Sequence, residues 1–215
     1  MSEAAVAAIR AGRVVVLPTD TVYGLAADAF HVEGRDALYA MKGRDVRQPS
    51  ALVTASAEVL FECLPELDAL SARIVEALLP GPFTLLLPNP AGRFAWLCGD
   101  DPTTIGVRVP ALAGPGKDVL DRVGAVVATS ANLPGGEEPR RLDDVPALFR
   151  AAAGAVVDGG ELPGVASTVL DVSGAEPRVV RAGAGDVAAA LAIVAALLVE
   201  SPQSDPGDSH VTGER

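Results

Sequence analysis

A short run of apolar and β-branched residues near the N-terminus, Val14–Leu17, narrows the choice of fold more than any other segment. Such a run is typical of a buried strand, and Pro18 is expected to end it because proline has no N–H to give to a sheet. Three hydrogen-bonding side chains, Thr19, Asp20 and Thr21, follow at the carboxyl end of this strand. In open α/β sheets, that end is where ligands bind. The segment therefore predicts an α/β fold with a ligand site beside these side chains.

The same pattern returns later in the chain, where the apolar run Ala125–Ala128 leads into the polar segment Thr129–Asn132. A basic cluster, Lys42-Gly43-Arg44, ends an expected helix between the two patterns. Two cations around a glycine suit an anionic ligand, most simply a phosphate. Taken alone, such a polar segment is usually an ordinary turn and such a basic cluster a solvated helix end. A functional role therefore depends on their combination.

Composition limits the classes of protein that the chain can belong to. Its 215 residues suffice for one large α/β domain or two small ones, and 49% are hydrophobic while only 4% are aromatic, so the core must consist of Val, Leu and Ala. A net charge of −11 opposes binding to nucleic acid or to acidic membranes over a broad face. A local basic pocket for a small phosphorylated ligand fits this charge better.

The few cysteines and histidines offer no metal cluster. Cys63 and Cys98 lie far apart, without a C-x-x-C spacing, and are expected to be reduced thiols in a cytosolic protein. His31 and His210 are the only histidines, so no metal-binding residues are expected. The N-terminus lacks the basic and apolar regions of a signal peptide, which favours a cytoplasmic location.

Periodicity and turn residues predict alternating helices and strands, with the strands clustered late in the chain, which indicates a mixed α/β sheet. We expect helices over Ser2–Ala11, Asp36–Lys42, Ala57–Leu64, Asp68–Leu79, Lys117–Val123, Asp143–Ala152 and Val187–Val199. We expect strands over Val14–Leu17, Ala51–Thr54, Phe83–Leu87, Thr104–Val109, Ala125–Ala128, Gly154–Val157, Ser167–Asp171 and Arg178–Arg181, and a loop that could hold a short strand over Phe94–Leu97. The last helix, capped by Asp186, is too short to span a bilayer. Residues 1–200 are expected to form the domain and residues 201–215 a disordered tail.

Candidate binding residues all fall at the ends of these elements. They are Thr19, Thr21, Lys42, Arg44, Arg108, Ser130, Asn132, Ser167 and Arg181. The chain has no P-loop, no G-x-G-x-x-G and no histidine suited to activate a nucleophile. The chemistry should therefore need no covalent intermediate, and would use cations and hydroxyls to position an anion and to stabilise its charge.

Seven short motifs, in order and at the right spacing, resemble the YrdC-like family, the L-threonylcarbamoyladenylate synthases. The match runs from about residue 3 to residue 198. The signature of the family is K-x-R followed far downstream by S-x-N, present here as Lys42/Arg44 and Ser130/Asn132. The seven motifs are Pro18-Thr-Asp-Thr-Val-Tyr-Gly-Leu25, Lys42-Gly-Arg44, Pro80-Gly-Pro-Phe-Thr84, Gly106-Val-Arg-Val-Pro110, Ser130-Ala-Asn132, Ser167-Thr-Val-Leu-Asp171 and Val180-Arg-Ala-Gly183.

The resemblance implies the single-domain form of the family: an open, twisted, mixed parallel and antiparallel sheet, flanked by helices, with a concave ligand-binding face. It also implies a nucleotidyltransferase that converts L-threonine, bicarbonate and ATP, with Mg²⁺, into threonylcarbamoyl-AMP and pyrophosphate. A separate threonylcarbamoyl transferase would then use the product to modify an adenosine in tRNA. Contact with tRNA itself would be weak or transient, and no membrane would be involved.

Matching the motifs residue by residue implies roles for individual side chains. Lys42 and Arg44 would be catalytic, neutralising charge on the phosphates and on bicarbonate. Threonine would be held by Thr21, Arg108, Ser130 and Ser167, with Arg108 on its carboxylate. ATP would be held by Arg44, Gln48, Thr104, Asn132, Arg140 and Arg181.

Departures from the family pattern keep other functions open. Asp45 replaces a proline, Val53 replaces a histidine that would help to bind threonine, Gln48 replaces an asparagine, and Arg140 stands where Ser or Thr is common. One alternative is a paralogue, or a carbamoyltransferase-type enzyme, that uses a different amine or donor. Another is an RNA-binding module, against which the net charge of −11 counts.

Overall fold

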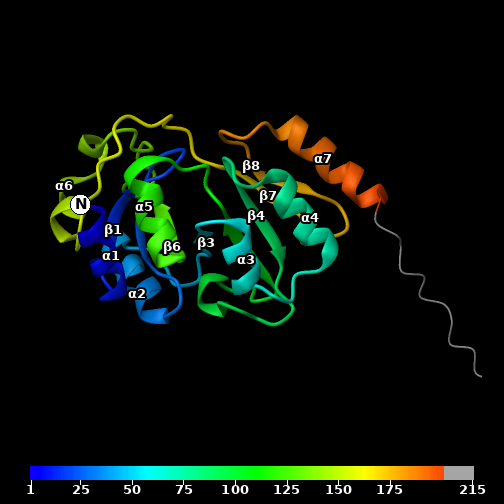
Figure 1. The fold of residues 1–215 in the computed structure, drawn as a ribbon, viewed down its shortest axis with the longest axis horizontal. Coiled ribbons are helices and arrows are strands. Elements are labelled where there is room, and N and C mark those ends of the chain that lie inside the picture. The colour runs from blue at the N-terminus through cyan, green and yellow to red at the C-terminus, as the bar shows by residue number, and fades with distance from the viewer. Residues whose placement is uncertain (201–215) are drawn as a thin grey trace, which may run out of the picture.

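A computed structural model of the protein describes residues 1–200, so the predicted tail over 201–215 lies outside the described residues. Figure 1 shows a central sheet with helices packed around it. The strands are β1 (Val15–Pro18), β2 (Tyr23–Asp28), β3 (Ala51–Thr54), β4 (Phe83–Pro88), β5 (Thr104–Arg108), β6 (Ala125–Ser130), β7 (Thr168–Asp171) and β8 (Arg178–Arg181). The helices are α1 (Ser2–Arg10), α2 (Val32–Lys42), α3 (Ala57–Cys63), α4 (Ala69–Leu78), α5 (Gly114–Val123), α6 (Ala147–Ala152) and α7 (Val187–Glu200).

All these strands belong to one sheet, in the order β1-β2-β6-β3-β5-β4-β7-β8. The β3–β5 and β4–β7 pairs are parallel and the remaining pairs are antiparallel. The predicted mixed α/β sheet is therefore confirmed. Most neighbours in the sheet are far apart in the chain, so residues from distant motifs are brought side by side.

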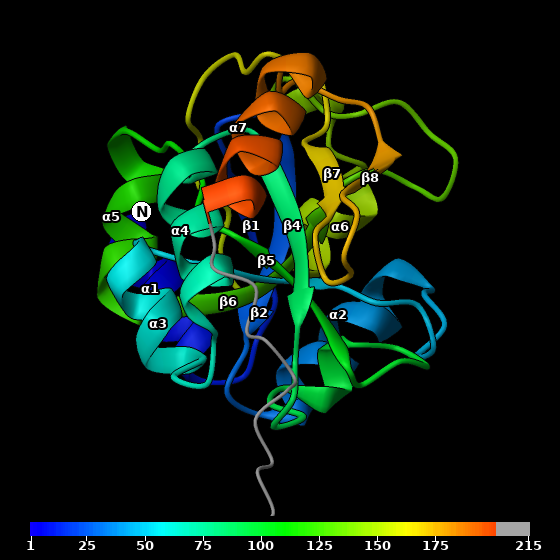
Figure 2. The same ribbon diagram turned by 90° about the vertical axis from the view of Figure 1, so that its right-hand side faces the viewer.

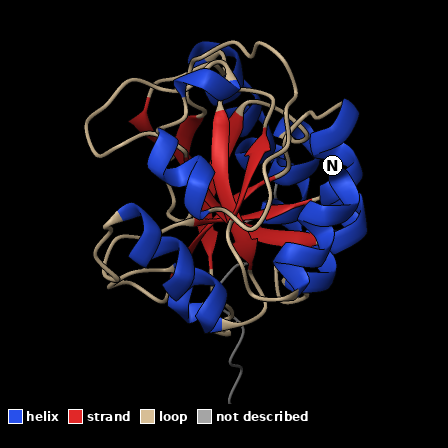
Figure 3. Ribbon diagram, turned by 90° about the vertical axis from the view of Figure 1, so that its left-hand side faces the viewer, coloured by secondary structure: helices blue, strands red, loops and turns tan. Residues whose placement is uncertain are grey.

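Helices cover the sheet on its outside, as Figure 3 shows. In β1, Val16 packs into a large core shared with α2, α3, α4 and α7, while Val15 and Leu17 pack into a smaller core under α1 and α5. Both faces of the strand are covered, which explains why its sequence is continuously apolar rather than alternating. Helix α7 packs against α4 and begins at Asp186, whose carboxylate accepts a hydrogen bond from Ala189 N at 3.0 Å, as the cap prediction required. Figure 2 shows α7 beside α4.

Four details differ from the elements expected from the sequence. The strand Tyr23–Asp28 was not predicted, because its glycine and alanines have low strand propensity. Phe94–Leu97 holds no strand: Ala95–Leu97 form a 3₁₀ turn after Phe94, which has a φ of 50°. Gly154–Val157 makes only an isolated bridge, between Val156 and Val16. The helix expected over Asp143–Ala152 is divided into a 3₁₀ turn and α6, because the residue before Pro146 is driven out of helical geometry.

No helix within residues 1–200 has the length and apolar character needed to cross a membrane.

Candidate functional site

A cavity of about 290 Å³ lies on the sheet over β3, β4, β5 and β6. Side chains alternate along these strands, so Leu85 and Ile105 are buried in the core while Leu86 and Gly106 line the cavity. Small residues open the space: Gly24, Gly106, Ala51 and Ala128 all lie on its wall. Its charged lining residues are Arg44, Arg108, Arg181 and Glu138.

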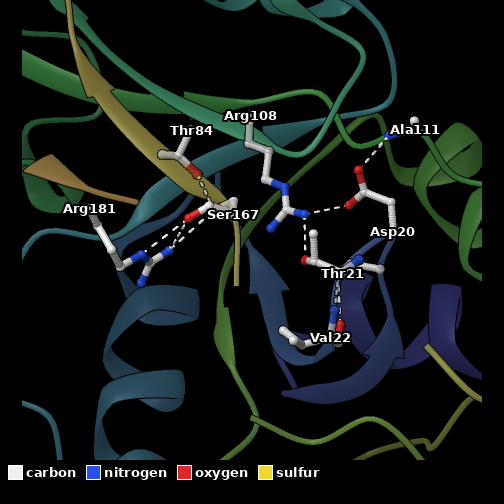
Figure 4. Close-up of polar contacts among 9 residues, drawn as sticks. Asp20, Thr21, Val22, Thr84, Arg108, Ala111, Ser167 and Arg181 are labelled. Atoms are coloured by element: carbon white, nitrogen blue, oxygen red, sulfur yellow. Dashed lines mark hydrogen bonds and ion pairs between the residues drawn. The ribbon is translucent and has the colours of Figure 1, made fainter. Parts of the chain in front are cut away.

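Arg108, at the end of β5, is held from one side by the segment after β1 (Figure 4). Its Nη2 pairs with the Asp20 carboxylate and donates to Thr21 Oγ1 at 2.7 Å. The second Asp20 oxygen accepts from Ala111 N at 3.0 Å. The side chains of Arg108 and Asp20 are only 11% and 9% exposed. The burial of Arg108 lowers its pKa, and the charge of Asp20 opposes that change.

This arrangement leaves part of Arg108 available. Within residues 1–200, the buried Nε has no hydrogen-bond partner, and the one nitrogen that Asp20 and Thr21 occupy is Nη2. A guanidinium fixed on one nitrogen, with its other donors free beside a cavity, is suited to bind a carboxylate.

Ser167 and Arg181 form the opposite wall, and Figure 4 shows Ser167 between the two arginines. The Arg181 guanidinium donates from Nη2 to Ser167 O at 2.9 Å and to Ser167 Oγ at 3.2 Å. Thr84 Oγ1 lies 2.9 Å from Ser167 Oγ. Two hydroxyls and an arginine from β4, the start of β7 and β8 are therefore joined at the cavity wall.

Lys42 lies at the end of α2, with its ammonium group against the end of β6. Nζ donates to Ser130 O and to Asn132 Oδ1, the latter at 3.0 Å. The pKa of Lys42 is lowered from 10.5 to about 8, chiefly because the side chain is buried and also because Arg44 is near, while Glu138 acts in the opposite direction. The K-x-R and S-x-N motifs, far apart in the chain, are therefore in contact in the structure.

Arg44 turns back toward the sheet because Gly43 adopts a φ of 67°, which a glycine tolerates without strain. Its Nη1 donates to Thr129 Oγ1 at 3.1 Å and its Nη2 to Pro49 O. The guanidinium also lies over the Tyr39 ring, 5.5 Å from the centroid. Arg44 is therefore fixed at the cavity from three directions.

The structure does not bring every candidate residue to this cavity. Thr21 is fully buried behind Arg108, Gln48 is exposed in the loop before β3, and Thr104 starts β5 away from the cavity lining. Asn132 and Arg140 line a second hollow of about 700 Å³, which shares Glu138 with the first. There Arg140 is exposed and pairs with Glu161 at 2.9 Å.

Val53 and Asp45, two of the departures from the family pattern, are placed differently. Val53 is 6% exposed and lines the cavity. The Asp45 carboxylate is in solvent and pairs with Arg47, which lowers the pKa of Asp45 to about 2.

Sequence reasoning gave no role to three residues that the structure places here. Asp20 was predicted only as one of three polar side chains beside a ligand site, with no role of its own, although an acid between two threonines after a strand was a usable signal. The Thr129 hydroxyl accepts a hydrogen bond from Arg44, and Glu138 lines both hollows. Nothing in the sequence distinguishes Glu138 from a solvated turn residue.

Together, the fold and the cavity define an α/β protein with an arginine-lined cavity on an open mixed sheet. The family model Sua5_yciO_yrdC, whose description is "Telomere recombination", matches residues 7–183, and the chain belongs to this family. The resemblance found from the motifs is thereby confirmed.

Named relatives and solved structures agree with this assignment. The chain is 34% identical to the threonylcarbamoyl-AMP synthase of Halorhodospira halophila, over 72% of this chain and 81% of that protein. It is 32% identical to the threonylcarbamoyl-AMP synthase of Pyrococcus abyssi, over 81% of this chain but only 52% of that longer protein. A crystal structure of P. abyssi Sua5 complexed with L-threonine matches with a TM-score of 0.81 and 29% identity, over 89% of this chain and 56% of that chain. The crystal structure of E. coli YciO matches with a TM-score of 0.76 and 25% identity, over 86% of this chain and 90% of that one.

Proposed function

We propose that the chain is a threonylcarbamoyl-AMP synthase, which converts L-threonine, bicarbonate and ATP into threonylcarbamoyl-AMP and pyrophosphate. Its relatives of that name support this function. The observation that carries the proposal is the meeting of Arg44, Arg108 and Arg181, from distant parts of the chain, around one cavity beside Lys42. Several fixed cations beside hydroxyl groups suit a ligand set made of a polyphosphate and a carboxylate.

The amino acid would bind between Arg108 and Ser167. Its carboxylate would meet the free donors of Arg108, and the Ser167 and Thr84 hydroxyls, 2.9 Å apart, offer hydrogen bonds on the facing wall. The P. abyssi relative, whose crystal structure carries L-threonine, supports an amino acid in this family. Because Asp20 already holds Arg108, the guanidinium loses little freedom when the ligand binds.

The reaction then needs orientation and charge stabilisation rather than a protein nucleophile. The threonine amine combines with bicarbonate to form a carbamate with loss of water, and a carbamate oxygen attacks the α-phosphate as pyrophosphate leaves. Lys42 and Arg44 would stabilise the negative charge on the phosphates, and Arg181 would contribute from the other wall. Mg²⁺ would enter with ATP, since no group of three His, Cys, Asp or Glu side chains within residues 1–200 is placed to hold a metal alone.

The product would serve a separate threonylcarbamoyl transferase that modifies an adenosine in tRNA, a reaction of the cytoplasm. Any contact of this chain with tRNA would be weak, because its net charge is −11.

Val53 supports a second candidate function, in which the same chemistry acts on another amine. This side chain gives the cavity an apolar wall, together with Val22, Leu86 and Val169, where an imidazole would have offered a hydrogen bond. An amino acid with an apolar side chain would suit that wall as well as threonine does.

The test is pyrophosphate release from ATP and bicarbonate with a panel of amino acids. Threonine-dependent and bicarbonate-dependent release is expected; release with another amine but not with threonine would favour the second candidate. Tight, salt-sensitive RNA binding without ATP turnover would refute both. Lys42→Ala and Arg44→Ala should each abolish release while leaving the circular dichroism spectrum unchanged. Lys117→Ala is the matched control, because Lys117 is the only other lysine and pairs with Asp121 on the surface of α5.

A further inference from the structure

We infer that Glu138 is a protein ligand of the magnesium ion that enters the cavity with ATP. Glu138 lies in the loop after Asn132, on the wall shared by the two hollows. Among residues 1–200, it is the only carboxylate that lines the arginine-rich cavity. Its Oε2 is buried and has no hydrogen-bond partner among residues 1–200.

An unpartnered carboxylate oxygen among so many cations is unexpected. Burying a charged acceptor without a partner costs free energy, and nearby cations would normally supply one. Within residues 1–200, none of them donates a hydrogen bond to Glu138: Lys42 donates to Ser130 and Asn132, and Arg44 to Thr129 and Pro49. Arg181 donates to Ser167. Glu138 acts on Lys42 only through its charge, which raises the pKa of that lysine. The oxygen is therefore left for a ligand.

The charge of the site favours a divalent cation as that ligand. Three arginines, Arg44, Arg108 and Arg181, line the cavity, and Lys42 lies beside it on Ser130. The nearby carboxylates are Asp20 and Glu138, and Asp20 is already paired with Arg108. The remaining positive charge is too small to neutralise the negative charge of a triphosphate and an amino acid carboxylate. Glu138 itself repels both ligands. Mg²⁺ relieves this repulsion, because it typically binds substrate phosphates together with one or two carboxylates rather than a full protein cage. A lone carboxylate is what such a shared site requires.

This inference rests on the proposed function, since it presumes that ATP binds. The experiment is calorimetric titration of the protein with ATP, with and without Mg²⁺, in the absence of amino acid and bicarbonate so that no turnover occurs. In the wild type, Mg²⁺ should tighten ATP binding by about tenfold or more, whereas in Glu138→Gln the effect should fall to about twofold or less. Without Mg²⁺, Glu138→Gln should bind ATP at least as tightly as the wild type, because the repulsion is gone.

Two further variants make the result specific. Glu138→Asp keeps the carboxylate and should retain part of the Mg²⁺ effect, and it also serves if the amide variant folds poorly. Glu176→Gln removes the same charge from an exposed residue that lines neither hollow, and it should behave as the wild type.

Three outcomes would overturn the inference. An equal Mg²⁺ effect in the wild type and in Glu138→Gln would show that the metal does not use this carboxylate. ATP binding weakened equally with and without Mg²⁺ would show that Glu138 accepts a hydrogen bond from the nucleotide instead. Failure of the wild type to bind ATP at all would refute the proposed function, and this inference with it.

Discussion

The buried pair of Asp20 and Arg108 gives the sharpest test of the site's construction. Asp20→Ala would leave the guanidinium without its counter-ion and Ala111 N without its acceptor. Only Thr21 would remain as a partner of Nη2. The variant should therefore lose stability and also lose the fixed orientation of Arg108.

The magnitude follows from burial. Removing one partner of a buried ion pair costs about 3–5 kcal/mol, because the other charge stays buried and uncompensated. Both side chains here are about nine-tenths buried, at 11% and 9% exposed, so the pair belongs to that class. The adjoining cavity admits water, which can partly solvate the exposed donors of Arg108, so the loss should lie at the lower end, about 3 kcal/mol.

The assay is urea unfolding at neutral pH, followed by circular dichroism and by the fluorescence of Trp96, the only tryptophan. Arg108→Met and the double variant complete a cycle in which the second substitution should recover about 2 kcal/mol of the loss. A loss below about 1 kcal/mol for Asp20→Ala, or additive effects in the double variant, would refute the claim that the two charges depend on each other.

Three other predictions follow from the geometry. ATP affinity should fall as the pH rises through about 8, because Lys42, with its pKa lowered to about 8, is charged below that pH and neutral above it. Lys42→Arg should remove this fall. A flat profile of ATP affinity in the wild type from pH 7 to 9 would contradict the role of Lys42. Gly183→Ala should lower the free energy of unfolding by about 1–3 kcal/mol and raise the KM for the amino acid. The added Cβ would lie 2.2 Å from Ala166 O and 2.6 Å from Ser167 O. Gly174→Ala, whose Cβ would have nothing within 4 Å, should be nearly neutral in the same urea assay. Tyr39→Phe should lower the free energy of unfolding in urea by about 1 kcal/mol and weaken ATP binding, because the Tyr39 hydroxyl donates to Gln48 O at 2.6 Å. If both values were unchanged, the loop that holds Gln48 would not depend on this hydrogen bond.

How much of the fold the sequence reveals depends on whether local propensity and tertiary packing agree. Val14–Leu17 was predictable because β-branched residues suit a strand covered on both faces. Tyr23–Asp28 was not, because Gly24 and its alanines are weak strand formers that are held by β1 and β6 on either side. Pairing with two neighbours overrides propensity, and it is invisible in a local window of sequence.

The same reasoning separates the site residues. The position of Lys42 and Arg44 was predictable, because a glycine after a helix favours the positive φ that Gly43 adopts, and this φ turns Arg44 toward the sheet. Their role in binding an anion stays a prediction. Glu138 was not predictable, since its position beside Lys42 depends on how a loop folds over the sheet. Gln48 and Thr104, which the family resemblance assigned to ATP, lie outside the cavity lining.

The strand order has a consequence for how the protein can be divided. Lys42 meets Asn132, Asp20 meets Arg108, and Thr84 meets Ser167, each across more than eighty residues of chain. A fragment that lacks either end would lack one wall of the cavity. Fragments could therefore regain ligand binding only if an N-terminal and a C-terminal fragment associated with each other. Conversely, any tight ligand stabilises the entire chain against unfolding and proteolysis, by about 2.7 kcal/mol when present at a hundred times its dissociation constant. Resistance to a protease would then report occupancy of the cavity without any enzymatic assay.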